Sequence, residues 1–78
     1  MKKLLEFILL GIVDKPKALK IQESEQDEVL TFTVGVAAED MGKVIGRGGQ
    51  IIKAIRTLLR VASAKSGKRV QILLEEKT

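Results

Sequence analysis

The chain has 78 residues, 45% of them hydrophobic, and its net charge is +4. It lacks Cys, His, Trp and Tyr, which excludes disulfides, thiolate or imidazole metal sites, and catalysis by Cys or His. We therefore expect a single domain over residues 1–78 with a thin core, and no enzyme activity, metal or cofactor. Residues 1–40 hold five Lys and eight acids, whereas residues 41–78 hold nine basic residues and two acids, so the second half is expected to present a polyanion-binding face.

The first predicted element is a helix that begins near residue 4 and ends at Asp14-Lys15-Pro16, because the residue before a proline disfavours the α region. Its apolar residues cover almost the whole circumference; they are Leu4, Leu5, Phe7, Ile8, Leu10, Ile12 and Val13. We expect this helix, including Phe7, to be buried on a sheet, with a partner-binding face as the alternative. Glu6 interrupts the apolar run, and no cleavage site follows, so we expect no signal peptide, no membrane insertion and a cytoplasmic protein.

Two strands come next and are predicted to form an antiparallel hairpin. Leu19 and Ile21 alternate with polar residues, and the segment from Val29 to Val36 is rich in β-branched and aromatic residues. Its inward face is expected to consist of Leu30, Phe32, Val34 and Val36. The acidic segment Glu23–Glu28 is predicted to be the turn. We interpret its carboxylates as solvated rather than as a metal or acid–base site, because no His accompanies them.

Two helices and a strand complete the chain. A short helix is predicted from Ala38 to Val44, with acids in its first turn, and a longer helix from Gly49 or Gln50 to Lys65. The apolar stripe of the longer helix is expected to be core; it consists of Ile51, Ile52, Ile55, Leu58, Leu59 and Ala62. Its opposite face carries Lys53, Arg56, Thr57, Arg60 and Ser63. A final strand over residues 70–74 precedes a polar tail at Glu75–Thr78, which gives the order α-β-β-α-α-β of an α+β fold.

The turn Gly46-Arg47-Gly48-Gly49 joins the two predicted helices. A tight connection needs one glycine, whereas three remove the Cβ atoms that would hold another backbone away. The first N–H groups of the following helix lack intrahelical partners, so a phosphate can bind there. Arg47 adds charge at the tip. Lys43, Lys53 and Arg56 lie within about two helical turns of it, although a solvated helix surface would account for the basic face equally well.

The segment Ile45-Gly46-Arg47-Gly48-Gly49-Gln50-Ile51-Ile52-Lys53-Ala54-Ile55 fills every fixed position of the KH-domain signature I-G-x-x-G-x-x-I-x-x-I. The chain therefore resembles a KH domain, and its element order resembles the type II arrangement. Residues 38–46 and 53–59 are similar to the small bacterial KH proteins of the KhpA family. The resemblance implies a three-stranded mixed sheet with three helices packed on it.

The resemblance also implies a function: non-catalytic binding of about four nucleotides of single-stranded RNA, clamped by the G-x-x-G loop. The residues expected to bind RNA are Gly46, Arg47, Gly48, Gly49, Lys43, Ile45, Gln50, Ile52, Lys53 and Arg56. Proteins of this family form homodimers, pair with a larger KhpB-type protein, and are linked to cell elongation and division as RNA chaperones or post-transcriptional regulators. The alternative is a dimerisation module whose KH fold mainly recruits the larger partner.

One loop position departs from the family pattern. Family members often carry two polar or basic residues in the middle of the loop, where this chain has Arg47 and Gly48. Gly48 lowers the local charge, and ordering it on binding costs conformational entropy. We therefore expect weak affinity for RNA unless dimerisation supplies a second site.

Overall fold

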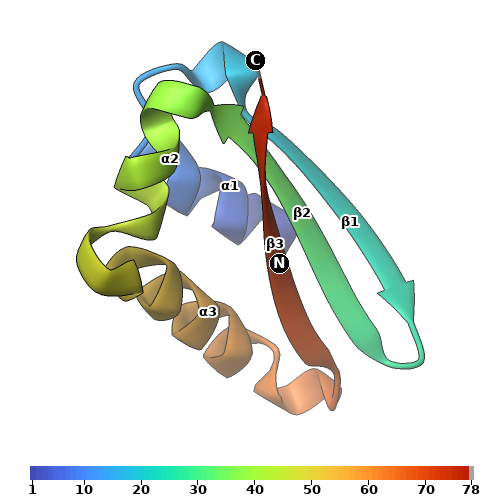
Figure 1. The fold of residues 1–78 in the computed structure, drawn as a ribbon. Coiled ribbons are helices and arrows are strands. Elements are labelled where there is room, and N and C mark those ends of the chain that lie inside the picture. The colour runs from blue at the N-terminus through green and yellow to red at the C-terminus, as the bar shows by residue number, and fades with distance from the viewer. Residues whose placement is uncertain (78) are drawn as a thin grey trace.

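In the computed structural model, which describes residues 1–77 and the side chains of residues 1–76, three α-helices cover one face of a three-stranded sheet (Figure 1). The elements are α1 Lys2–Leu10, β1 Lys20–Gln26, β2 Val29–Ala37, α2 Ala38–Ile45, α3 Gln50–Ala62 and β3 Arg69–Lys77. Single 3-10 turns span Pro16–Ala18, Arg47–Gly49 and Ala64–Ser66. The predicted order α-β-β-α-α-β and the α+β class are confirmed.

The sheet is mixed, and β2 is its central strand. β2 pairs antiparallel with β1 and parallel with β3. A parallel pair needs a long crossover connection, and α2 and α3 with the glycine turn between them provide it. This is the arrangement that the resemblance to type II KH domains implies, and it places the turn at the far side of the crossover, away from the hairpin (Figure 1).

The core lies between the sheet and the helices. The alternating residues of β2 that were predicted to face inward are all buried; they are Leu30, Phe32, Val34 and Val36. They meet Leu5 and Leu9 of α1, Val44 of α2, and Ile72 of β3 in one cluster. The period-2 pattern of a strand with one buried face therefore predicted this half of the core correctly.

The hairpin turn is much shorter than predicted. β1 continues through Gln26, so only Asp27 and Glu28 form the turn, both with positive φ, at 52° and 64°. Two residues of positive φ match the right-handed twist of the flanking strands. Apart from Ile21, all side chains of β1 are exposed, so the acidic part of the strand carries no alternating pattern by which it could have been recognised.

Helix α1 is shorter and less buried than predicted. It ends at Leu10 rather than at Asp14, and it buries only the side that carries Leu5 and Leu9. Phe7 is 78% exposed, and Leu4 and Leu10 are also exposed, so the prediction that Phe7 belongs to the core is wrong. The physical reason is that a helix lying on one face of a sheet is covered from one side only.

Helix α3 shows the same partial burial. Ile52, Ile55 and Leu59 are buried, whereas Ile51 and Leu58, predicted as core, are 38% and 53% exposed. The apolar stripe is wider than the side of the helix that packs against the rest of the protein. Ala62, the last residue of the predicted stripe, is exposed as well.

The end of α3 and the last strand also differ from the prediction. The helix stops at Ala62, and the next residue, Ser63, is buried and donates its hydroxyl hydrogen bond to the Arg60 carbonyl at 3.2 Å. Strand β3 continues to Lys77, over most of the predicted polar tail, because Glu75 and Glu76 pair with Gly35 and Val36 of β2. Backbone pairing overrides the polar character of these side chains. Thr78 lies outside the described residues.

Candidate nucleic-acid interface

The glycine turn is built from backbone conformations that only glycine adopts readily. Gly46, Gly48 and Gly49 have φ of 76°, 64° and 77°. Gly46 ends α2, with its N–H bonded to the Gly42 carbonyl at 2.8 Å, and Gly49 immediately precedes α3. Residues that carry a Cβ adopt such conformations only at an energetic cost, so this run of glycines explains how the chain can turn from one helix into the next within a single 3-10 turn.

Gly46 is required for a second reason, close packing. A Cβ atom at Gly46 would lie 2.6 Å from Cγ1 of Ile51 and 2.9 Å from its backbone nitrogen. A Cβ at Gly48 would meet nothing within 4 Å. The first glycine of the signature therefore lets the start of α3 approach the loop, whereas Gly48 leaves open space on its outer side.

Two of the amides expected to face a phosphate are already used within the loop. The N–H of Gly49 donates to the Gly46 carbonyl at 3.1 Å, and the N–H of Gln50 donates to the Arg47 carbonyl. Of the N–H groups at the start of the second helix, which we expected to bind a phosphate, that of Gln50 is therefore already engaged within the loop. These internal bonds fix the shape of the loop, and fewer N–H groups remain for a ligand.

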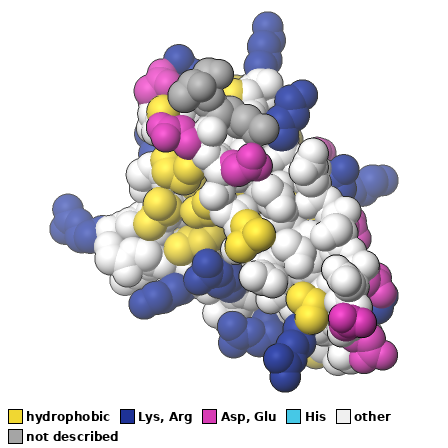
Figure 2. Space-filling view, turned by 45° about the vertical axis from the view of Figure 1, so that its right-hand side comes forward, with side chains coloured by type: hydrophobic (Ala, Val, Ile, Leu, Met, Phe, Trp, Pro, Cys, Tyr) yellow, Lys and Arg dark blue, Asp and Glu magenta, His cyan; other side chains and the backbone are white. Residues whose placement is uncertain are grey.

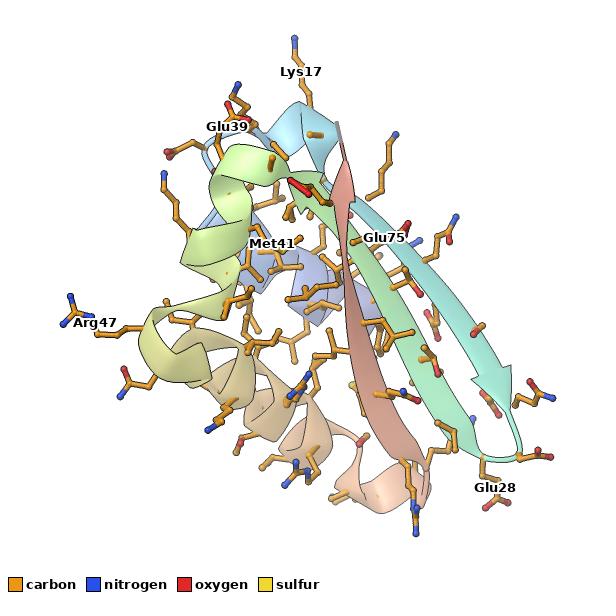
Figure 3. All side chains as sticks on the ribbon, viewed as in Figure 1. Lys17, Glu28, Glu39, Met41, Arg47 and Glu75 are labelled. Carbon is orange, nitrogen blue, oxygen red and sulfur yellow. The ribbon has the colours of Figure 1, made fainter. Side chains whose placement is uncertain are left out.

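The cations around the loop differ in their exposure and in their ion pairs. Arg47 is exposed and projects outward from the tip (Figure 3). Lys53 is exposed, and its Cε lies 4.0 Å from the point where a Cβ of Gly49 would be, so its side chain lies beside the loop. Arg56 and Gln50 are exposed on the same helix. The structure thus brings these four predicted residues to one side of the molecule.

Lys43 is in a different situation, because it points to the segment that follows α1. Its ammonium group forms an ion pair with Asp14 and lies 4.0 Å from Oδ1 of Asp40. Asp40 is 1% exposed, and its carboxylate accepts the backbone N–H of Asp14 at 3.1 Å and that of Lys15 at 2.9 Å. The buried carboxylate fixes this segment against α2, which holds the Asp14 side chain in reach of Lys43.

Neither Asp14 nor Asp40 was singled out from the sequence. Asp40 fits the general preference for acids in the first turn of a helix, and its true partners lie 26 and 25 residues away. A second ion pair joins the same two segments, with Lys15 Nζ 2.5 Å from Oε2 of Glu39. The hydrogen bond and charge of Glu39 raise the pKa of Lys15, and the hydrogen bond from Lys15 lowers the pKa of Glu39.

An apolar strip runs beside the loop, between the helices and β3. Both α2 and α3 contact β3, and half-buried hydrophobic residues border this junction: Met41, Ile45, Val70 and Leu74. In Figure 2 hydrophobic side chains gather toward the left of the view, and Lys and Arg side chains border them on the left and below. Of the two residues predicted to line a base groove, Ile45 is half-buried, but Ile52 is only 7% exposed and belongs mainly to the core.

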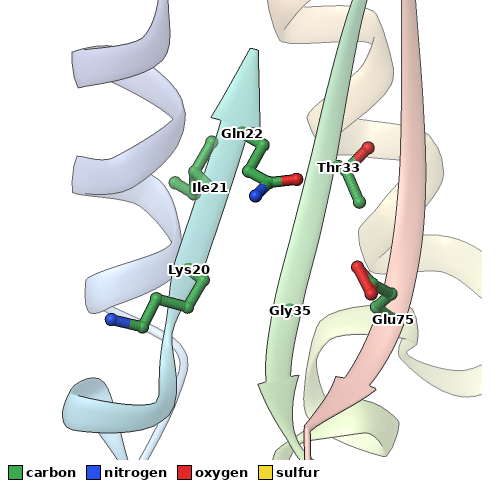
Figure 4. Close-up of a pocket in the computed structure, with 6 residues that line it drawn as sticks. All are labelled: Lys20, Ile21, Gln22, Thr33, Gly35 and Glu75. Carbon is green, nitrogen blue, oxygen red and sulfur yellow. The ribbon is translucent and has the colours of Figure 1, made fainter.

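A separate hollow of about 250 Å³ lies on the sheet face that the helices leave open (Figure 4). It lies over Gly35, which has no side chain and stands in register between Lys20 and Glu75. Its lining includes none of the residues predicted to bind RNA. We therefore place the candidate site at the loop and the apolar strip, not here.

Two further findings concern the described residues. Within residues 1–76, no cluster of His, Cys, Asp or Glu is arranged to hold a metal ion. No helix in the described part of the chain is long and apolar enough to cross a membrane.

Comparison with known proteins assigns the family. The family model for the KH domain of KhpA and KhpB matches residues 2–74. A Clostridium acetobutylicum protein named RNA-binding protein KhpA is 44% identical over 72 residues, which cover 92% of this chain and 96% of that protein. Namesakes from Listeria monocytogenes and Chlamydia pneumoniae are 40% identical over 76 residues and 38% identical over 78 residues. These alignments cover 97% and 99% of this chain, and 100% of each relative.

No solved structure matches the chain in the comparison of structures. The assignment instead combines three observations: the α-β-β-α-α-β order with its mixed sheet, the glycine turn between α2 and α3, and a family match over nearly the whole chain. The chain belongs to the KhpA/KhpB family of KH-domain proteins.

Proposed function

We propose that this protein is a non-catalytic, cytoplasmic RNA-binding protein that holds single-stranded RNA at the loop Gly46–Gly49. The RNA backbone lies against the loop, where the Gly48 amide and the N–H groups at the start of α3 that are not bonded within the loop donate hydrogen bonds to a phosphate. Arg47 and Lys53 supply charge, with Gln50 and Arg56 farther along α3. The bases lie on the apolar strip, mainly on Ile45 and only marginally on Ile52.

The observation that carries this proposal is the loop itself. Three glycines of positive φ leave the loop backbone without Cβ atoms beside the exposed Arg47, at the N-terminal end of a 13-residue helix. The strip beside it is aliphatic, so bases would pack on side chains such as Ile45 and Met41 rather than stack on aromatic rings. The relatives' name, RNA-binding protein KhpA, points to the same ligand.

A double substitution in the loop tests the proposal. Arg47→Asp with Gly48→Asp places two carboxylates where a phosphate would bind, and Asp is among the residues that tolerate positive φ. A matched control, Lys2→Asp with Lys17→Asn, lowers the net charge by the same three units at two exposed residues remote in sequence from the loop. We expect the loop variant to lose RNA crosslinking in cells and the control to keep it. Equal retention of RNA by both variants would show that the loop is not the site.

A second role, as a dimerisation module that also recruits a larger KhpB-type protein, is favoured by the outer face of α3. Ile51, Ala54, Leu58 and Val61 follow the i, i+3, i+7, i+10 spacing of a helix-pairing seam. Leu58 and Val61 are 53% and 70% exposed. We propose that this seam pairs with a second copy around a two-fold axis, which would give the weak loop a second site on the same RNA.

The seam is tested by Leu58→Asp, with Thr57→Asp as the control on the neighbouring, polar position of α3. Sedimentation velocity should show a dimer for the unmodified protein and for Thr57→Asp, and a monomer for Leu58→Asp. A monomer in all three samples would exclude the homodimer.

In cells, we propose that RNA binding in this form supports RNA-chaperone or post-transcriptional control of elongation, division and cell-wall growth. Depletion of the protein should then change cell length.

A further inference from the structure

A basic hollow lies where α3 ends and β3 begins, at the opposite end of α3 from the glycine loop. Its volume is about 430 Å³, and its walls come from the end of α3, the turn at Gly67 and the start of β3. Arg60, Lys68 and Arg69 contribute the charged side chains, and Ala64 and Val70 contribute apolar surface. Of the residues that line the hollow, only Val70 also borders the apolar strip described above.

Two of these cations are available to a ligand. Lys68 is held by Glu25, with Nζ and Oε1 2.8 Å apart, and this carboxylate raises the pKa of Lys68. Arg60 and Arg69 are exposed, and neither forms an ion pair with a carboxylate of residues 1–76. The helix dipole favours a cation near the end of α3, which accounts for Arg60, but Arg69 belongs to β3 and has no such explanation.

A continuous row of cations connects the glycine loop to this hollow. Lys53, Arg56 and Arg60 follow each other at i, i+3 and i+7, which places them on one face of α3, and all three are exposed. The 13 residues of α3 span about 20 Å. Lys53 lies beside Gly49 at one end of the row, and Arg60 lines the hollow at the other.

We propose that an RNA strand held at the glycine loop continues along this row, and that Arg60 and Arg69 bind one of its phosphates at the hollow. The inference rests on the function proposed above and extends it to a second RNA subsite. Two guanidinium groups from different elements can hold one phosphate with several charge-assisted hydrogen bonds. The adjoining sugar and base then pack on Val70, which is half-buried against the core.

The neighbouring surface marks the end of the RNA path. Arg69 also lines a smaller hollow of about 200 Å³ together with Asp27 and Glu28, the two residues of the hairpin turn. Their carboxylates repel a phosphate that advances beyond Arg69. The bound strand therefore extends from the glycine loop to the α3–β3 junction and no farther, which gives a footprint longer than the four nucleotides held by a KH loop.

The test compares short and long RNA. Fluorescence anisotropy is measured with unstructured strands of about four and about ten nucleotides, the shorter matching the length that a KH loop holds. The variant is Arg60→Gln with Arg69→Gln, which removes both guanidinium groups from exposed positions. The control is Lys65→Gln, which removes an exposed cation of the same turn that does not line the hollow. Circular dichroism confirms that each variant is folded.

We expect the double variant to bind the long strand about five- to ten-fold more weakly, and to lower the magnitude of its salt slope by about 0.7, the share of one phosphate contact on a single strand. The affinity of the double variant for the short strand should stay within about two-fold of that of the unmodified protein. Lys65→Gln should leave the affinities for the short and the long strand unchanged. Unchanged binding of the long strand by the double variant, an equal loss for both strands, or an equal loss in Lys65→Gln would overturn the subsite while leaving the loop function intact. A protein that binds neither strand before substitution would instead overturn the proposed function.

Discussion

At the scale of single residues, the glycines of the loop have different tasks. Gly46 combines a φ of 76° and ψ of 171° with the close approach of Ile51, so it faces both a conformational and a steric requirement. Gly48 has only the conformational one, since open space surrounds it. Gly42, inside α2, has neither. Three alanine substitutions can therefore separate the two requirements.

We predict that Gly46→Ala lowers the free energy of unfolding by about 1–3 kcal/mol, because a backbone region reserved for glycine must be adopted and Ile51 must shift. RNA binding should fall as well, since the displaced Ile51 lies in the first turn of α3, next to the loop. Gly48→Ala should cost about 1–2 kcal/mol, and Gly42→Ala should stabilise by about 0.5–1 kcal/mol. Urea denaturation measures all three, and a Gly46→Ala variant as stable as the unmodified protein would contradict the close packing.

At the scale of elements, the contact between α2 and the segment after α1 controls one of the proposed RNA-binding cations. Lys43 is neutralised by Asp14, while the buried carboxylate of Asp40 holds the backbone on which Asp14 stands. A phosphate that recruits Lys43 must first displace Asp14, and an exposed ion pair of this kind is worth about 0.2–1 kcal/mol. Asp14 therefore competes with RNA.

We predict that Asp14→Asn raises RNA affinity up to about five-fold and increases the magnitude of the salt slope by about 0.7, the share of one freed cation. The backbone N–H of Asp14 still reaches Asp40, so thermal stability should change little. Anisotropy at several salt concentrations measures both effects. An unchanged slope would show that Lys43 takes no part in RNA binding. Its role would then be structural only, through the ion pair with Asp14.

Sequence periodicity correctly predicted the buried residues of elements in which one face is fully buried and the other is not. β2 is the best case, because Leu30 to Val36 alternate and every second residue is buried. Periodicity failed where apolar residues outnumber the available contacts, as at Phe7 in α1 and Leu58 in α3, since hydrophobic character does not reveal how much of a helix its neighbours cover. It also failed in β1, where backbone pairing holds a strand whose acidic side chains are exposed.

The candidate site was predictable in part. The glycine spacing indicated the loop, and positive φ at three glycines confirms the need for them. The Asp14–Lys43 pair and the buried Asp40 could not be predicted, because they join residues 25 to 29 positions apart through a contact that depends on the packing of α2. The internal bonds of the Gly49 and Gln50 amides likewise follow from the exact turn geometry, which spacing alone does not specify.

At the scale of the whole molecule, the fold places the glycine loop and the acidic hairpin turn apart, although Lys68 pairs with Glu25 and Lys43 with Asp14. The hairpin turn at Asp27-Glu28 lies at the end of the sheet far from the glycine loop (Figure 1). The exposed cations of α3, which are Lys53, Arg56 and Arg60, follow that loop in the chain. This separation turns a modest net charge of +4 into a basic path along one side. An RNA strand would be drawn to that side and repelled at the hairpin.

We predict that binding of a short single strand weakens with salt, with a slope of log K against log salt concentration of magnitude about 2–4, as expected for a few phosphate contacts. Titrations between low and physiological salt measure the slope. A flat response would mean that apolar contacts alone hold the RNA, and the basic side would then be a solvated surface.

The measurement that bears most directly on the glycine loop is a nuclear magnetic resonance titration of the labelled protein with a short single-stranded RNA. We predict the largest amide shifts from Gly46 to Lys53, with smaller shifts at Ile45 and along β3 near Leu74. The open face of the sheet around Gly35 should remain unchanged. Shifts confined to α1 or to the open sheet face, with the loop amides unmoved at saturation, would contradict it.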